Sequence, residues 1–353
     1  MVSPGQWGRL VWSIGLSALV TIGILAWLLH HRPASLWALW QQAWAWEPLL
    51  AYAAISLAGA VGRTWRYRWL LAGTRVRYSD LFLVTLVRNF TVDLLPARAG
   101  SLSYPALLYY RLRVPATATW ASFIWAFVWD IAALAVVLWI AWWAVGPRIA
   151  HGVWLLILPA GLTMVTGTVI LLPARLWRRW LAALAYMRHR WLLRILRRRF
   201  PAFSRWIRGL ADIGTSGRDR PLRMLGVSLL IRGCKYGSLY VLYAHFVRSL
   251  DAHAPALDIL SFIWTITAAE ATAFLPVQGL FNIGPWEAAW TLATQWVQAH
   301  TRDVLGVLSA FVHWTAQVWE YGLGGIALVW LLTRRNPGQQ RNHGGQRPEG
   351  EIA

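Results

Sequence analysis

The sequence predicts an all-α polytopic integral membrane protein with about six full transmembrane helices and two re-entrant helical hairpins, which we expect to form an inverted repeat. Three observations support this fold class. Of the 353 residues, 58% are hydrophobic and only 14% are charged, whereas a soluble domain carries about a quarter charged residues. Several apolar segments have the length of about 20 residues that a helix needs to cross the hydrocarbon core. Arginines gather in alternate segments between these apolar stretches.

The apolar segments give the expected spans in chain order. The clearest are 10–29, 117–145, 153–172, 222–247 and 304–332, and a further span lies between 30–47 and 63–79. The first segment is too long for the apolar region of a signal peptide and is expected to be retained as a helix. The 27 tryptophans suit both aromatic belts at the membrane interfaces and packing inside the bundle.

The arginine distribution predicts the orientation of the chain. Arginine accounts for 33 of the 34 basic residues, and the net charge is +20. Segment 63–79 holds five arginines, 173–220 holds thirteen and the tail from 333 holds four. Each of the intervening segments 30–47, 146–152, 248–256 and 298–303 holds one. This positive-inside pattern places both termini in the cytoplasm, and it argues for a membrane rather than a nucleic acid as the partner.

Two segments must enter and leave the membrane on the same side for this alternation to hold. They are 80–112, on the cytoplasmic side, and 257–297, on the outer side. Each contains Leu-Pro followed by glycine, in "LLPARAG" and in "FLPVQG", and broken backbone at membrane depth is tolerated only inside protein or beside a water-filled cavity. We therefore expect two re-entrant hairpins related as inverted repeats. Their hinge residues are Pro96, Gly100, Pro276, Gly279 and Gly284.

The remaining segments are polar. In 173–220, apolar residues recur at helical spacing with arginines between them, which predicts an amphipathic helix on the cytoplasmic face near anionic headgroups. An ordinary topological determinant without lipid specificity explains the same pattern. The membrane domain then covers 1–332, and 333–353 forms a polar cytoplasmic tail that we expect to be disordered.

Ionisable residues in the first hairpin and the span after it are candidates for headgroup binding, because each costs about 2.5–3.5 kcal/mol on insertion. Arg98 would hold a phosphate through its planar guanidinium, with Asp93 orienting it or carrying a proton; a structural ion pair is the alternative. Arg88 and Asn89 lie just before, and Arg88 either binds the headgroup or extends to the interface. Asp130 needs a partner, for which Arg98 and Arg232 are the obvious choices.

The second half offers a matching set of candidates. Arg232 and Lys235 share a helical face, which makes them the best anion site of this half. Asn282 and Glu287 flank Gly284, and Pro285 is suited to start a helix whose free amides favour an anionic headgroup; Glu287 there is alternatively only an acid that suits the helix dipole. The proton-relay candidates are Glu270, His313 and Glu320, with Gln317 on the same stripe as the last two; hydrogen bonding between helices is the alternative.

Four stretches give the chain a family resemblance. They are "RTWRYRWLLAG", "LLPARAGSLSYPALL", "FVWDIAALAVV" and "FLPVQGLFNIGPWEAA". Over about residues 10–332 the chain resembles the lysylphosphatidylglycerol synthase transmembrane family of flippase-like domains. The resemblance implies a multi-pass protein of the bacterial cytoplasmic (inner) membrane. The chain departs from the fused synthases of this family: because only a short tail follows residue 332, we expect a standalone membrane domain without the aminoacyl-transferase domain.

The sequence and the resemblance together favour a lipid flippase over an enzyme. The expected activity is movement of an anionic or modified phospholipid between leaflets. Membrane lipids are the expected partners, and enzymes of lipid or glycan biosynthesis are further candidates. No catalytic motif is found, and the single cysteine, Cys234, excludes a disulfide framework; we expect neither a metal nor a cofactor. The alternatives are a membrane transferase that uses Asp93, Asp130 or Glu287 as acid or base, and a non-transporting accessory subunit.

Overall fold

The computed structural model describes residues 15, 18–27, 40–41, 43–146, 156–171, 220–250, 256–272, 283–297 and 302–334. The side chains of 96–98, 171 and 302–304 are not part of this description. The hinge residues Pro276 and Gly279, the candidate Asn282, most of the basic segment 173–220 and the tail beyond 334 lie outside the described residues. So do the side chains of Pro96 and Arg98.

Every described element is helical, which confirms the all-α prediction. The first half contains α3 (Trp46–Leu70), α4 (Tyr78–Leu94), the 3-10 helix η1 (Pro96–Leu102), α5 (Ser103–Ala106), the π-helical turn η2 (Leu107–Arg111), α6 (Ala116–Val145) and α7 (Ile157–Leu171). The second half contains α11 (Pro221–Leu250), α12 (Ile259–Ala271), α13 (Pro285–Val297) and α14 (Arg302–Thr333). Among the described helices, α6 is long and apolar enough to cross a membrane, with a mean hydropathy of 2.2.

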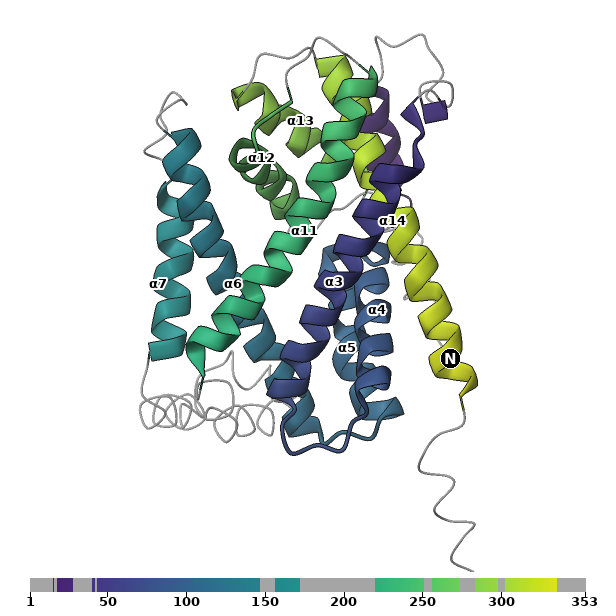
Figure 1. Ribbon diagram of the computed structural model, residues 1–353, viewed down its shortest axis with the longest axis vertical. Coiled ribbons are helices and arrows are strands. Elements are labelled where there is room, and N and C mark those ends of the chain that lie inside the picture. Colours follow the sequence, from purple (N-terminus) through teal and green to yellow (C-terminus); the bar gives the residue numbers. More distant parts are fainter. Residues whose placement is uncertain are drawn as a thin grey trace, which may run out of the picture.

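Two shorter helical hairpins lie at opposite ends of the molecule. In Figure 1, α3, α11 and α14 run obliquely through most of its height. The hairpin formed by α4 and the η1–α5–η2 segment occupies the lower half, whereas α12 and α13 form a hairpin in the upper half. Helices α6 and α7 pair along one flank. The two hairpins therefore reach toward the middle of the molecule from opposite ends.

The first hairpin turns at Pro96. Helix α4 ends at Leu94 and η1 begins at Pro96, because proline has no N–H to continue the hydrogen bonding of a helix. The returning chain then lies directly on α4. The Thr91 hydroxyl donates to the Gly100 carbonyl oxygen at 2.8 Å, and a Cβ atom at Gly100 would lie 1.6 Å from the Thr91 carbonyl oxygen. Only glycine fits at this position.

The second hairpin has a different local construction. Asp258 caps α12 by accepting hydrogen bonds from the backbone amides of Leu260 and Ser261, at 3.1 and 3.0 Å. Helix α13 begins at Pro285, directly after Gly284, whose φ of +106° lies in the region that favours glycine. The Thr21 hydroxyl donates to the Ile283 carbonyl oxygen at 3.1 Å. The helical segment Ala18–Trp27 thus contacts the start of α13.

Each hairpin packs into its own hydrophobic cluster. The cluster around α12 and α13 includes Tyr243, Phe262, Trp290 and Phe311. The cluster around α4 and α5 includes Tyr67, Tyr104, Leu108 and Trp129. Because α11 and α14 contribute to both clusters, these long helices connect the two hairpins.

The structure corrects one feature of the predicted topology. Segment 63–79 was expected to be a loop because it is rich in arginine, yet α3 continues to Leu70. Arg63, Arg66 and Arg68 are therefore helical, and only 71–77 forms the connection to α4. The physical reason is visible at Arg66, which is completely buried against an acidic partner on α6. A buried, paired arginine does not mark a loop.

Candidate substrate-binding cavity

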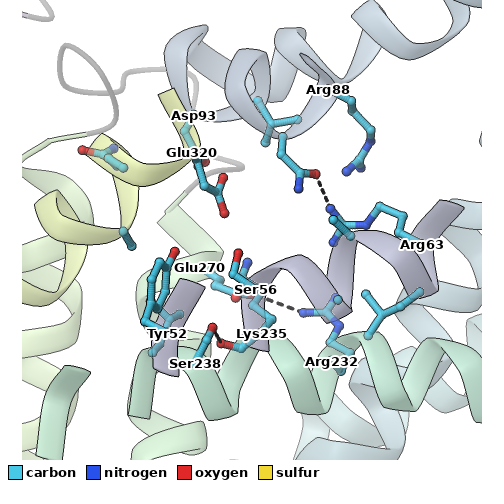
Figure 2. A pocket seen from close by; sticks show the side chains of 18 of the residues that line it. Tyr52, Ser56, Arg63, Arg88, Asp93, Arg232, Lys235, Ser238, Glu270 and Glu320 are labelled. Carbon is cyan, nitrogen blue, oxygen red and sulfur yellow. Dashed lines mark hydrogen bonds and ion pairs between the residues drawn. The ribbon is translucent and has the colours of Figure 1, made fainter. Parts of the chain in front are cut away.

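A polar cavity of about 190 Å³ lies where the two hairpins meet the long helices (Figure 2). One face of each of four helices lines it, and the residues recur at the spacing of a helical face. Helix α3 contributes Tyr52, Ser56, Gly59, Ala60 and Arg63; α4 contributes Arg88, Asn89, Val92 and Asp93. Helix α11 contributes Ile231, Arg232, Lys235, Ser238 and Leu239; α14 contributes His313, Ala316, Gln317 and Glu320. Asp130, Glu270 and Trp286 complete the lining from α6, α12 and α13.

The first charged group at the cavity is a bidentate ion pair. The guanidinium of Arg66 donates to both carboxylate oxygens of Asp130, at 2.6 and 3.1 Å, and to the Ser228 hydroxyl at 2.8 Å. The Arg66 side chain is fully buried, and the Asp130 side chain is 20% exposed. Paired planar groups satisfy each other's charge in such geometry. The pair joins α3, α6 and α11 and leaves little free charge at Asp130.

A second group neutralises the two cations of α11. Glu270 accepts from Arg232 at 3.1 Å through Oε2 and from the Lys235 ammonium at 2.7 Å through Oε1. Arg232 also donates to the Tyr236 hydroxyl at 3.0 Å and to the Asp130 carbonyl oxygen at 3.4 Å. Figure 2 shows Glu270, Lys235 and Arg232 together on one wall. The predicted anion site on α11 thus has an internal carboxylate.

Two further arginines face the cavity without an acidic partner among the described side chains. Arg63 donates to the amide oxygen of Asn89, which carries no charge. Arg88 points into the same space from α4 (Figure 2), and the buried Nε atoms of both arginines lack a hydrogen-bond partner. The two guanidinium groups are close enough to repel each other. An anion placed between them would relieve this repulsion and satisfy free donors.

Two carboxyl groups lie together on another wall. Asp93, in the last turn of α4, and Glu320, on α14, are close neighbours in the lining of the cavity. Neighbouring carboxyl groups repel each other when both are ionised, and a hydrogen bond between them would require a proton. Neither takes part in an ion pair with another described side chain.

Glu287 occupies a closed site beside the cavity. Its carboxylate is fully buried and accepts from the Gly284 amide at 2.6 Å and from the Trp314 indole at 3.1 Å. His313 Nδ1 lies 2.6 Å from Oε1 of Glu287, and the His313 ring stacks on Trp286 at 4.1 Å. These contacts hold the start of α13 against α14. Glu287 does not line the cavity, although His313 and Trp286 do.

The structure brings most sequence-predicted candidates into this one cavity. They are Arg88, Asn89, Asp93, Asp130, Arg232, Lys235, Glu270, His313, Gln317 and Glu320. Arg88 lines the cavity, although an extension to the interface was the alternative. One expectation needs correction: the side chain of Asp130 pairs with Arg66, and Arg232 contacts only its backbone carbonyl oxygen, whereas the side chain of Arg98 lies outside the description. The sequence did not indicate Arg66 as the partner of Asp130, because the arginine-rich segment 63–79 predicts a loop.

Sequence reasoning missed Arg63, Arg66, Tyr52 and Ser56. A signal for three of them was present. Tyr52, Ser56 and Arg63, with Gly59 between them, recur at spacings of four, three and four residues, which is a polar and small stripe on an otherwise apolar helix. Among the described residues, no cluster of three His, Cys, Asp or Glu side chains is arranged to hold a metal ion.

One long apolar helix among the described elements, hairpins that approach from opposite ends and a cavity lined with paired charges are consistent with an α-helical membrane protein that has an internal polar site. Residues 11–325 match the family described as "Lysylphosphatidylglycerol synthase TM region". The chain belongs to this family, which identifies it as a membrane protein associated with lipid metabolism or translocation. No curated protein and no solved structure matches the chain.

Proposed function

We propose that this protein moves an anionic or modified phospholipid between the leaflets of the bacterial cytoplasmic membrane. The headgroup enters the cavity while the acyl chains remain in the bilayer. Family membership supports a role with lipids, and the charged lining supports an anionic group as the part that is bound. The sequence contains no nucleotide-binding motif that would couple the movement to ATP.

The observation that carries this proposal is the pair Arg63 and Arg88. The other cavity cations already face carboxylates, because Glu270 pairs with Arg232 and Lys235. Arg63 and Arg88 have no carboxylate partner among the described side chains and keep buried donors without an acceptor. Guanidinium groups bind phosphate oxygens through two parallel hydrogen bonds. A phosphate between α3 and α4 would supply the missing negative charge.

The arrangement of the hairpins supports a route for the headgroup. We infer that the α4–η2 hairpin and the α12–α13 hairpin are re-entrant and form an inverted repeat, with cytoplasmic termini. Transporters built this way place their substrate site near the midplane, where the repeats meet, and alternate its access by rocking one repeat against the other. The cavity here takes residues from both hairpins, including Asp93 and Glu270.

Reconstitution in liposomes tests the proposal. Vesicles would carry phosphatidylglycerol or phosphatidylethanolamine with a fluorescent label, and quenching from outside would report how much lipid has crossed. We expect the wild-type protein to move the anionic phosphatidylglycerol faster than the zwitterionic phosphatidylethanolamine. Substitution of both arginines, Arg63→Gln with Arg88→Gln, is expected to slow this movement at least about tenfold, because each charge-assisted hydrogen bond contributes about 1.5–3 kcal/mol.

The matched control is Arg68→Gln, on the exposed side of α3, where the arginine contacts only a backbone carbonyl oxygen. It should leave the rate unchanged. Equal movement by the wild type and the double variant would contradict the headgroup site. Mass analysis of the recovered lipids separates the remaining alternative, because a membrane transferase would return chemically converted lipid instead of unchanged lipid.

A further inference from the structure

We propose that Asp93 and Glu320 form a proton-binding site that is filled together with the anionic headgroup, so that the protein is a lipid–proton symporter. This inference rests on the proposed function and adds the coupling ion to it. The two carboxyl groups lie side by side on the wall of the cavity that also contains Arg63 and Arg88 (Figure 2).

The geometry of the pair favours a single bound proton. The carboxyl groups are close neighbours on the cavity wall, and like charges in such a position repel when both are ionised. One proton between them replaces the repulsion with a hydrogen bond. Because the pair lines an open cavity, the proton can exchange with water there.

The neighbouring charged and titratable groups explain how headgroup binding affects the proton. The groups that face the pair are Tyr52 and Arg63 from α3, Lys235 from α11 and Tyr321 from α14. Lys235 is engaged with Glu270 at 2.7 Å, whereas Arg63 has only the neutral amide of Asn89. In the empty cavity the uncompensated charge of Arg63 therefore opposes protonation of the pair.

An anionic headgroup changes this balance. When phosphate binds at Arg63 and Arg88, it neutralises Arg63 and places a further negative charge in the same small cavity. Both effects favour protonation of Asp93 and Glu320. By linkage, a protonated pair favours headgroup binding to the same extent. One proton with one monoanionic headgroup carries no net charge.

The pair also lies where it affects the first hairpin. Asp93 is in the last turn of α4, just before the helix break at Pro96. One turn earlier, Phe90 packs edge-on against Tyr321 with ring centroids 5.6 Å apart, and Gly324 accommodates Phe90 at close range. The proton therefore acts at the contact between α4 and α14, and its loss would push the end of α4 away from α14.

Proteoliposomes with labelled phosphatidylglycerol and a trapped pH-sensitive dye test the symport. With a pH difference of one unit across the membrane, coupling of one proton per lipid would accumulate the lipid in the leaflet facing the more alkaline side, up to about tenfold. The dye should report proton movement with the lipid. A membrane potential set with potassium and valinomycin should not change the lipid ratio.

The variant with Asp93→Asn and Glu320→Gln keeps the shape of both side chains and removes the titration. This double variant should equalise the lipid between the leaflets, without accumulation on one side and without proton movement. The control is Glu47→Gln, which replaces an exposed acid in the first turn of α3 and should behave like the wild type. A second measurement does not need transport. In weakly buffered detergent solution, adding phosphatidylglycerol should cause proton uptake by the wild type and none by the double variant.

The outcomes distinguish the two proposals. Wild-type protein that moves the lipid but shows neither accumulation nor proton uptake would overturn the symport and leave translocation standing. Accumulation of lipid that persists in the double variant would overturn the assignment of the proton site to Asp93 and Glu320, and it would also leave translocation standing. If the wild type moves no lipid and takes up no proton, both proposals fall.

Discussion

Arg63 and Arg66 are three residues apart on α3, and their surroundings differ in a way that assigns them different roles. Arg66 is fully buried and bound to Asp130 and Ser228, so that its donors on two nitrogens are used within the protein. Arg63 contacts the neutral Asn89 and faces the cavity. Removing one partner of a buried ion pair leaves an uncompensated charge, whereas an arginine at an open cavity can be replaced with less effect on folding.

At the residue scale we predict that Arg66→Gln destabilises the protein strongly. Loss of the cation leaves Asp130 charged and poorly solvated, which costs about 3 kcal/mol in comparable buried pairs. Thermal unfolding of the purified protein in detergent, followed by tryptophan fluorescence, would measure the change. The exposed Arg68→Gln serves as the control. A melting temperature for Arg66→Gln that matches this control would show that the pair contributes little.

The contact between α4 and α14 depends on the absence of a side chain. A Cβ atom at Gly324 would lie 2.1 Å from Cβ of Phe90 and 2.9 Å from the carbonyl oxygen of Leu86. Both atoms belong to or adjoin the backbone, so the helices themselves would have to separate. Small residues serve this purpose at helix interfaces in membranes, where close backbone approach replaces the hydrophobic effect as the source of association.

At the element scale we predict opposite outcomes for two adjacent glycines of α14. Gly324→Ala should lower the melting temperature, because it forces α4 away and disturbs the position of Asp93 beside Glu320. Gly325→Ala meets nothing within 4 Å and should be neutral or stabilising, because alanine favours the helix by about 1 kcal/mol relative to glycine. Equal melting temperatures for the two variants would show that the helices can adjust at this contact.

The whole molecule combines two hydrophobic clusters through long helices. The first cluster holds the α12–α13 hairpin, the second holds the α4–η2 hairpin, and α11 and α14 contribute to both. The polar cavity takes residues from each hairpin and from the helices that connect them. Any change in the relative position of the two clusters would therefore change the shape of the cavity.

At the scale of the molecule we predict the sidedness of the hairpins. In a Cys234→Ser background, single cysteines would replace Arg75 and Arg113 at the ends of the first hairpin, and Ala256 and Val297 at the ends of the second. A membrane-impermeant maleimide should label the first two positions from the cytoplasmic side and the other two from the outer side. If the cysteines at positions 75 and 113 were labelled from different sides of the membrane, a re-entrant first hairpin would be excluded.

The sequence by itself determined the helical class, the approximate helices and their breaks. These are local properties: apolar length predicts helices such as α6 and α14, and Pro96 and Pro285 mark where helices begin. The residues that carry charge in apolar surroundings were also identifiable, because hydrophobic flanks make each ionisable group conspicuous. Ten predicted polar residues therefore line the cavity. The sidedness of the hairpins and the function remain predictions.

Only the tertiary structure decided which charge faces which. Asp130 pairs with Arg66, 64 residues away in the chain, and Asp93 meets Glu320 from another helix. A single sequence gives the face on which a residue lies but not the helix that covers this face. The division of the cavity into neutralised pairs, a free arginine pair and a carboxyl pair follows from helix packing, because electrostatic interaction depends on distance in space and not on separation along the chain.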